Sequence, residues 1–294
     1  METAQYEPAP CQDQYVRTLG VDLATTDGST GICEVDWRAR TGIVEVGRFT
    51  DDLIARRIKD VRDAGGWAAI DAPFGFPAAF ALAVEQWRST GFVSPATDHA
   101  IRRRLTDEYV AARQSVVKAE HLSGGWNPWP LSSVVDLITP TVIRCARILT
   151  IVNARTPTDR VGLTSRIVEA YPVAALRCWQ VPTYKYKTVA ADCRLIFEDL
   201  VGRTGVREPT QRGPLRNGCD DDAVDAFVCA LVARAVASSA GATGPIAAGG
   251  VYAAQLSTIR EEGWIHLPPP GHSLEALQQR DRLKRTGPHD EVLQ

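Results

Sequence analysis

Four aspartates occupy six positions in the stretch NGCDDDAVDAF, residues 217–227, and the chain then becomes apolar. Asp222 and Asp225 are three residues apart, which would place them about 60° apart on one surface of a helix. Asp220 and Asp221 stand where N-cap and first-turn acids satisfy free backbone amides. We therefore predict that Asp220 and Asp221 begin a helix and that Asp222 and Asp225 carry chemistry. The alternative is that all four only begin the helix.

Three more acids stand near the C-terminal ends of predicted strands: Asp22 in YVRTLGVDLA, Asp71 in WAAID and Glu169 in TSRIVEAYP. In an open α/β sheet that end of the strands is where ligands bind. An unpaired charge in an apolar strand is costly to bury. Each acid taken alone fits a strand-end cap or an ion-pair partner equally well. Together with the helix acids they predict one shared site.

A cluster of carboxylates without histidine or cysteine suits a hard cation such as Mg²⁺ or Mn²⁺. The five histidines form no His-Glu-x-x-His motif. Two such ions about 3.5–4 Å apart activate water and stabilise the leaving oxygen in phosphodiester cleavage. Water or hydroxide is then the nucleophile. The carboxylates would hold these ions.

The elements that must position these acids follow from the hydrophobic pattern. Three strands are predicted first, the second and third forming a hairpin through the turn RARTG. A capped helix and a fourth strand follow, and the helix supplies the crossover that a parallel strand requires. The predicted ranges are 15–24, 29–37 and 41–49 for these strands, 51–66 for the helix and 67–71 for the fourth strand.

The next segment, residues 77–165, is predicted to be a mostly helical insertion that covers the active-site edge. Its helices are expected at 77–89, 97–120 and 132–155, the last interrupted near Pro140. A fifth strand, two helices, a linker at 240–250 and a short strand at 261–270 follow. We therefore expect one α/β domain over residues 15–270, with flexible tails at 1–14 and 271–294.

Composition excludes some functions. The net charge is −2, so no global basic field attracts nucleic acid, and any contact with it needs a local basic patch or a metal. The seven cysteines are odd in number and form no Cys-x-x-Cys pair, which favours a reducing, cytoplasmic location. No apolar run approaches the ~20 residues that span a membrane, and the first residues do not form a signal peptide pattern.

Two basic segments are candidates for substrate binding. Arg102 and Arg103 belong to the densest basic stretch, AIRRRLTDEYVAAR, although a solvated helix face explains them as well. Lys185 and Lys187 alternate with tyrosines in PTYKYK, a pattern that suits single-stranded nucleic acid. A surface strand or loop is the more common explanation of so short a segment. We expect DNA or RNA as the partner.

These motifs, taken in order, resemble the ribonuclease H-like superfamily of nucleases. More closely, GVDLA, IDAPFGFP, RIVEAYP, DDAVDAFVCALVA and EEGWIHLP resemble the family called domain of unknown function 429, a predicted nuclease group. The resemblance covers roughly residues 15–270. It implies a mixed five-stranded sheet flanked by helices and a metal site held by Asp22, Asp71, Asp222 and Asp225. Glu169 would be a further catalytic residue, either as another ligand or as a group that orients the substrate. The fourth-strand acid is usually Glu in resolvase-like members, whereas this chain has the shorter Asp71.

Two other functions fit parts of the sequence. The stretch DLATTDGSTG also resembles the phosphate-binding hairpin of sugar kinases, actin and Hsp70, in which Thr25, Thr26 and Ser29 would contact phosphate. An ATP-dependent phosphotransferase is therefore the second hypothesis, although no adenosine motif accompanies the hairpin. The third is a non-catalytic scaffold that binds a partner through the helical insertion. A homodimer is compatible with each of them.

Overall fold

The computed structural model describes residues 17–25, 29–116, 127–135, 138–154, 156–183, 186–212, 220–239 and 242–278. The predicted tail at 1–14 lies outside these ranges. Within them, no helix combines the length and the apolar character needed to cross a membrane.

A mixed sheet forms the centre of an α/β fold. Its strands are β1 (Arg17–Asp22), β2 (Thr30–Asp36), β3 (Thr41–Gly47), β4 (Trp67–Asp71), β5 (Ile167–Glu169) and β6 (Thr210–Arg212). The spatial order is β5-β4-β1-β2-β3-β6. β2 is antiparallel to β1 and β3, whereas β4 and β5 run parallel to β1. The five predicted strands are confirmed. β6 was not predicted, because it is a three-residue strand that pairs only with the edge strand β3.

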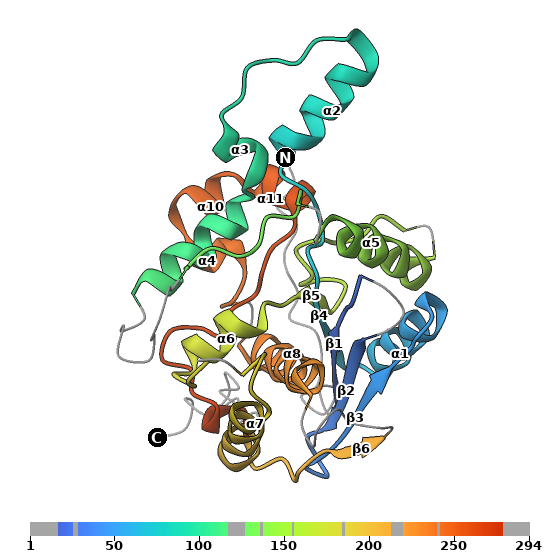
Figure 1. Ribbon diagram of the computed structural model, residues 1–294, viewed down its shortest axis with the longest axis vertical. Helices are drawn as coiled ribbons and strands as arrows, with labels where there is room; N and C mark the ends of the chain where they lie inside the picture. The colour runs from blue at the N-terminus through green and yellow to red at the C-terminus, as the bar shows by residue number, and fades with distance from the viewer. Residues whose placement is uncertain are drawn as a thin grey trace, which may run out of the picture.

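Helices cover both faces of this sheet (Figure 1). α6 (Pro172–Cys178), α7 (Ala190–Thr204) and α8 (Asp221–Ser238) pack on one face, and α1 (Asp51–Asp63) and α5 (Thr139–Asn153) pack on the other. α8 is apolar on all sides, as expected for a helix enclosed by the sheet and other helices. Because successive strand residues point to opposite faces, Leu19 and Val21 of β1 pack towards α1 and α5.

Glycines at two strand positions let α8 lie directly on the sheet. A Cβ atom at Gly20 would lie 1.9 Å from the carbonyl oxygen of Ala226, and one at Gly31 would lie 2.2 Å from that of Asp222. Only a residue without a side chain fits at such a distance. The N-terminal half of α8 is thereby held against the C-terminal end of β1.

The segment between β4 and β5 is helical, as predicted, but its helices differ from the expected ones. They are α2 (Ala78–Thr90), α3 (Asp98–Arg102), α4 (Leu105–Ser115) and α5. One predicted helix at 97–120 is two, because the chain is extended at Arg103 and Arg104. Pro140 lies in the first turn of α5 and starts that helix instead of interrupting it. α2 projects away from the sheet, and none of its residues is buried.

The C-terminal part of the chain differs most from expectation. The predicted linker forms α9 (Pro245–Ala248) and α10 (Gly250–Ala254), followed by α11 (Leu256–Glu262). The prediction of a strand at 261–270 is wrong: this segment contributes one isolated bridge, between Ile265 and Glu169. Next to the bridge, the amide of Trp264 donates to the carbonyl of Arg160 at 3.2 Å, and that of Ile265 donates to the hydroxyl of Thr106 at 2.7 Å.

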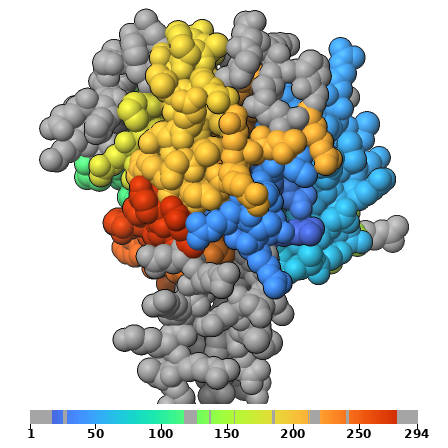
Figure 2. Space-filling view, turned by 90° about the horizontal axis from the view of Figure 1, so that it is seen from below, coloured from blue at the N-terminus to red at the C-terminus, as the bar shows by residue number. Residues whose placement is uncertain are grey.

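Residues 271–278 do not form the expected tail. Leu274 and Leu277 are buried beside α7 and α8, and the 3-10 helix η2 (Glu275–Gln278) forms an ion pair from Glu275 to Arg203 at 2.7 Å. Figure 2 shows this red segment lying against the yellow-orange surface that includes α7. Two buried leucines were too weak a periodic signal to predict this packing. The remainder of the predicted tail lies outside the described residues.

Candidate metal centre

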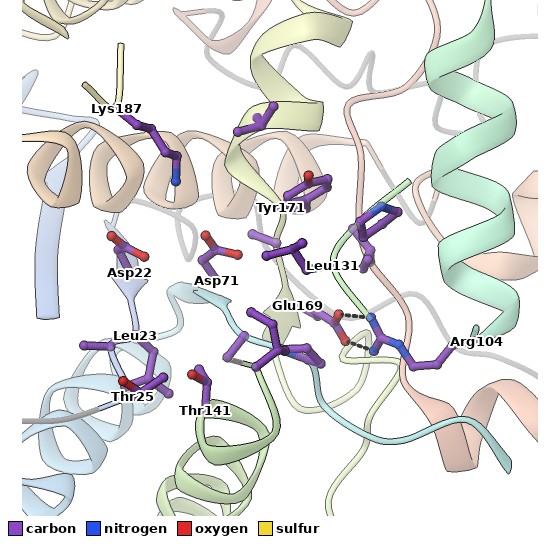
Figure 3. A pocket seen from close by; sticks show the side chains of 18 residues that line it. Asp22, Leu23, Thr25, Asp71, Arg104, Leu131, Thr141, Glu169, Tyr171 and Lys187 are labelled. Atoms are coloured by element: carbon purple, nitrogen blue, oxygen red, sulfur yellow. Dashed lines mark hydrogen bonds and ion pairs between the residues drawn. The ribbon is translucent and has the colours of Figure 1, made fainter. Parts of the chain in front are cut away.

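Asp22 and Asp71 are neighbours in the sheet. They are directly paired at the C-terminal ends of the parallel strands β1 and β4. Both therefore point to the face that α8 covers, where the close approach at Gly20 brings Asp225. Oxygen atoms of Asp22, Asp71 and Asp225 lie within 4.8 Å of one another. The structure thus brings together three of the four predicted metal ligands, and Figure 3 shows Asp22 and Asp71 side by side below Lys187.

Burial and repulsion from neighbouring acids make Asp22 and Asp71 unusually weak acids. Desolvation, followed by the charges of Asp225 and Asp71, raises the pKa of Asp22 well above its ordinary value. The same desolvation, together with the charge of Asp225, raises the pKa of Asp71 to about 7. Like charges held this close disfavour ionisation unless a cation joins them. A bound cation would supply that compensation.

Asp225 is fully buried, and the side chains of two adjacent residues bind its carboxylate. Tyr186 donates its hydroxyl to Oδ1 at 2.8 Å, and the Lys187 ammonium lies 2.6 Å from Oδ2. The position of Asp225, one turn beyond the helix start, puts it beside the sheet and away from the free amides. Asp225 and its neighbours raise the pKa of Lys187, so that this side chain is a cation within the carboxylate cluster.

The acids that precede Asp225 form a second group. Asp220 is the N-cap of α8 and accepts a bond from the amide of Asp222 at 3.2 Å, and Asp221 lies in the first turn, which confirms their predicted helix-start role. Oxygens of Asp220, Asp221 and Asp222 also lie within 4.8 Å of one another. Asp222 hydrogen-bonds to Asp22, and desolvation and the neighbouring acids raise its pKa to about 6. Asp222 therefore links the two groups.

Glu169 lies at the same edge of the sheet but is not joined to the three aspartates. In the register of β4 and β5 it pairs with Ile70, whereas Asp71 is one residue further on. Because strand residues alternate, Glu169 points to the face opposite that of Asp71. The sequence showed an acid at a strand end but not the register, and the register decides the face.

Arg104 neutralises Glu169. Its two terminal nitrogens lie 2.8 Å and 2.9 Å from the carboxylate oxygens of Glu169, and the second of these oxygens also accepts a bond from the amide of Phe74 at 2.9 Å. Arg104 also pairs with Asp107 at 3.0 Å, and all three charged side chains are buried. Both oxygens of Glu169 are therefore engaged by protein groups. The sequence did not indicate this role, because Arg104 looked like one member of an exposed basic run.

Glu262 joins the same network from α11. Its two carboxylate oxygens accept bonds from the amides of Ala78 and Leu105, the first residues of α2 and α4, at 2.8 Å and 2.7 Å. Such bonds satisfy free backbone amides at the start of a helix. A carboxylate there also interacts favourably with the helix dipole. The helices of the insertion are thereby fixed to the chain segment that follows α8.

A cavity of about 480 Å³ opens beside Asp22 and Asp71. Figure 3 shows these aspartates at one end, the Glu169–Arg104 pair at the other, Tyr171 and Leu131 on one side and Thr141 on the opposite side. Most of its other walls are apolar. They are formed by Leu23, Ala24, Ala72, Pro73, Pro130, Ile138, Ala170, Val173 and Ile265. A second cavity, of about 280 Å³, lies on the other side of Lys187 and is lined by Asp220, Asp221 and Asp222.

The predicted substrate-binding residues have different positions. Lys187 lines both cavities. Arg103 lies over the ring of Trp129, 4.9 Å from its centroid, and donates to the carbonyl of Pro130 at the rim of the larger cavity. Arg102 is exposed at the end of α3. Lys185 lies outside the described residues.

The loop proposed to bind phosphate lies at the same end of the sheet. Thr25 lines the larger cavity and Ser29 the smaller one, while Thr26 lies outside the described residues. Arg144 of α5 fixes this loop by donating to the carbonyl of Ala24 at 3.1 Å and to the hydroxyl of Thr30 at 3.2 Å. Arg144 thus binds residues on either side of this loop, from the face of the sheet opposite α8.

The ligands present fit a hard divalent cation. The clustered donors are carboxylate oxygens from three separate elements, and in the part of the chain that the structure describes, neither group includes histidine or cysteine. This is the ligand set of Mg²⁺ or Mn²⁺, and it disfavours zinc. Burial and the neighbouring acids raise the pKa values of Asp22 and Asp71 even with Lys187 beside them, so a divalent cation bound there would favour the ionised carboxylates.

The sequence was compared with protein families, curated proteins and solved structures. No curated protein and no solved structure matches it. The model of one family, described as protein of unknown function (DUF429), matches residues 20–248, which include β4, α8 and the end of β1 with their aspartates. The chain therefore belongs to the DUF429 family.

Proposed function

We propose that this protein is a metal-dependent nuclease or a related phosphodiesterase with a ribonuclease H-like fold. The observation that carries the proposal is the convergence of Asp22, Asp71 and Asp225 from three elements to within 4.8 Å. A cluster that only began a helix would not draw in two strand-end acids. Such acids at the carboxyl ends of neighbouring parallel strands occupy the usual ligand-binding edge of an α/β sheet.

The fold assignment is supported by the succession of elements. The chain forms two antiparallel strand pairings from β1 to β3, then a crossover helix, two parallel strands and the closing helix α8. This is the order that the resemblance implies. The helices between β4 and β5 lie where the insertion was expected. β6 extends the far edge of the sheet, away from the aspartates, and does not alter the site.

In this proposal Asp22, Asp71 and Asp225 hold Mg²⁺ or Mn²⁺, and Asp222 holds or orients a second ion. Bound metal would supply an activated water and stabilise charge on the phosphate and the leaving oxygen, as in two-metal nucleases. Lys187, whose ammonium already faces the cluster, would contact a phosphate oxygen of the substrate. Arg103 at the cavity rim would contact an adjacent phosphate. Glu169 and Arg104 hold the opposite end of the cavity in place.

Hydrolysis assays test the proposal directly. The protein is incubated with single-stranded, duplex and branched DNA and RNA in Mn²⁺ or Mg²⁺, beside the double variant Asp22→Asn, Asp225→Asn. We expect cleavage by the native chain and a loss of at least about 10³-fold in the variant, because metal-held charge supplies several kcal/mol of transition-state stabilisation. Equal cleavage by both proteins would show contamination and refute the assignment of these residues.

An ATP-dependent stabilisation without any phosphodiester cleavage would instead support the phosphotransferase. A matched control for the asparagine substitutions is Asp98→Asn, which removes an exposed carboxylate from the first turn of α3. This variant should cleave as fast as the native chain.

A further inference from the structure

We propose that the cavity beside Asp22 and Asp71 receives one unpaired nucleobase, so that the substrate is the end of a single strand and not an intact duplex. This inference rests on the proposed function and specifies its substrate class. Three properties of the cavity support it: the residues that line it, its volume and its position beside the aspartates.

The walls of the cavity suit a flat, mostly apolar group. Tyr171 and Leu131 lie together on one side, and Leu23 and Thr141 lie across from them (Figure 3). A tyrosine ring beside aliphatic side chains is a surface on which any base can stack. Thr141 is buried and lines this space, and its hydroxyl is a hydrogen-bonding group of the kind that orients a ligand in an apolar pocket.

The volume excludes a duplex. About 480 Å³ is within the range of cavities that enclose small molecules, and it is far too small for paired strands. A base can enter only if it is out of its stack and unpaired. Duplex binding through the backbone also needs many phosphate contacts. The chain has a net charge of −2. Among the described residues, the cations beside the cavity are Lys187 at the aspartates, Arg103 at the rim and Arg104, which is already paired with Glu169.

The position of the cavity connects the base to the chemistry. The same space is bounded by Asp22, Asp71 and Lys187 at one end, so a base held against Tyr171 would place its own phosphate towards the carboxylates. The Glu169–Arg104 ion pair closes the opposite end, and both of its charges are already matched. It therefore offers a rigid wall and no competing site for phosphate.

Binding measurements test the inference without any need for turnover. Deoxyadenosine 5′-monophosphate and deoxyribose 5-phosphate, which lacks the base, are titrated into the protein with Mn²⁺ in a calorimeter. Single-stranded octadeoxyadenylate is compared by fluorescence anisotropy with the same eight residues paired to octathymidylate in one hairpin, on the Asp22→Asn, Asp225→Asn variant to prevent cleavage. We expect the base to strengthen binding by roughly tenfold or more, the scale of one stacked base. We also expect single strands to bind at least about tenfold more tightly than duplex. Binding of the mononucleotide without any binding of the single-stranded octamer would overturn the assignment to a strand end.

Variants make the test specific to the cavity. Tyr171→Phe should keep the preference for the base and Tyr171→Ala should remove it. Leu131→Asp places a charge at the mouth and should weaken mononucleotide binding about tenfold. Leu131 is 61% exposed, so this change leaves the core intact, and Leu195→Asp on α7, at 63% exposure, is its matched control. Equal binding with and without the base, or equal binding of duplex and single strand, would overturn the inference. Because Tyr171 and Leu131 are not metal ligands, Mn²⁺ binding and cleavage report separately on the proposed function.

Discussion

The ammonium of Lys187 lies 2.6 Å from Oδ2 of Asp225, so a cation that belongs to the chain stands within the carboxylate cluster. Asp225 is buried and its other oxygen is occupied by Tyr186. A divalent ion that binds Asp225 must therefore share this carboxylate with Lys187 or displace it. This relationship gives the site a testable competition between two cations.

Replacing Lys187 by Met should tighten Mn²⁺ binding while slowing hydrolysis. The affinity should rise several-fold because the competing charge is gone, and cleavage should fall about tenfold or more because a phosphate contact is lost. Calorimetry measures the first effect and a cleavage assay the second. Lys59→Met, on the exposed side of α1, is the control. Weaker Mn²⁺ binding in Lys187→Met would show instead that the ammonium keeps the carboxylates in position.

Gly20→Ala should disrupt the site through the fold. The added Cβ would lie 1.9 Å from the carbonyl oxygen of Ala226, so α8 must move away from β1 and carry Asp225 with it. Overpacking of this kind costs about 1–3 kcal/mol or more of unfolding free energy. Gly202→Ala in α7 meets nothing within 4 Å and should stabilise the chain by up to about 1 kcal/mol. Denaturant unfolding compares the two variants, and an unchanged midpoint for Gly20→Ala would contradict the close packing.

Arg104→Met should be among the most destabilising single substitutions. It leaves Glu169 and Asp107 charged and buried without their partner, a change that costs about 3–5 kcal/mol in other buried ion pairs. Urea denaturation measures the loss. A cost below about 1 kcal/mol would indicate that water replaces the guanidinium.

Glu169→Gln separates this ion-pair role from metal binding. Because both Glu169 oxygens are engaged by Arg104 and the Phe74 amide, the variant should bind Mn²⁺ with native stoichiometry. Asp71→Asn should lose at least about tenfold in Mn²⁺ affinity, since it removes a charged ligand. If the two variants weaken Mn²⁺ binding equally, Glu169 is also a ligand.

The carboxylate cluster should make the metal-free protein less stable as pH rises. Burial and the charge of Asp225 raise the pKa of Asp71 to about 7 in the folded chain, from its ordinary value of 3.8. The folded state thus holds a proton that the unfolded state releases, so the stabilisation is complete below about pH 4 and is lost as pH passes through 7. With EDTA present, the Tm difference between Asp71→Asn and the native chain should shift in favour of the variant between pH 5 and 8. Saturating Mn²⁺ should abolish that shift, and a pH-independent difference would contradict the raised pKa.

The sequence predicted the elements of the site better than their contacts. Strand-end acids and the spacing of Asp222 and Asp225 indicated which side chains would converge, because strand direction and helical period are local properties. Whether Glu169 faces the cluster depends on the register between β4 and β5, which no local pattern reveals. Its partner Arg104 is 65 residues away in the sequence. Long-range ion pairs of this kind leave no periodic signal.

The predicted boundaries of the helices were wrong for a related reason. The sequence from 97 to 120 has continuous helical periodicity, but the chain is extended at Arg103 and Arg104 so that Arg104 can reach Glu169 and Glu262 can cap α4. Tertiary bonds outweighed local propensity there. The burial of Leu274 and Leu277 likewise depends on α7 and α8, elements that precede them by tens of residues.

The most direct test of the account is the anomalous scattering of Mn²⁺ in crystals of the full chain. We predict an anomalous peak between Asp22, Asp71 and Asp225, with carboxylate oxygens at coordinating distance, and its loss in crystals of the Asp22→Asn, Asp225→Asn variant. A well-ordered structure at saturating Mn²⁺ with no peak among these three side chains, or with Lys187 still bound to Asp225 in place of metal, would contradict the central claim.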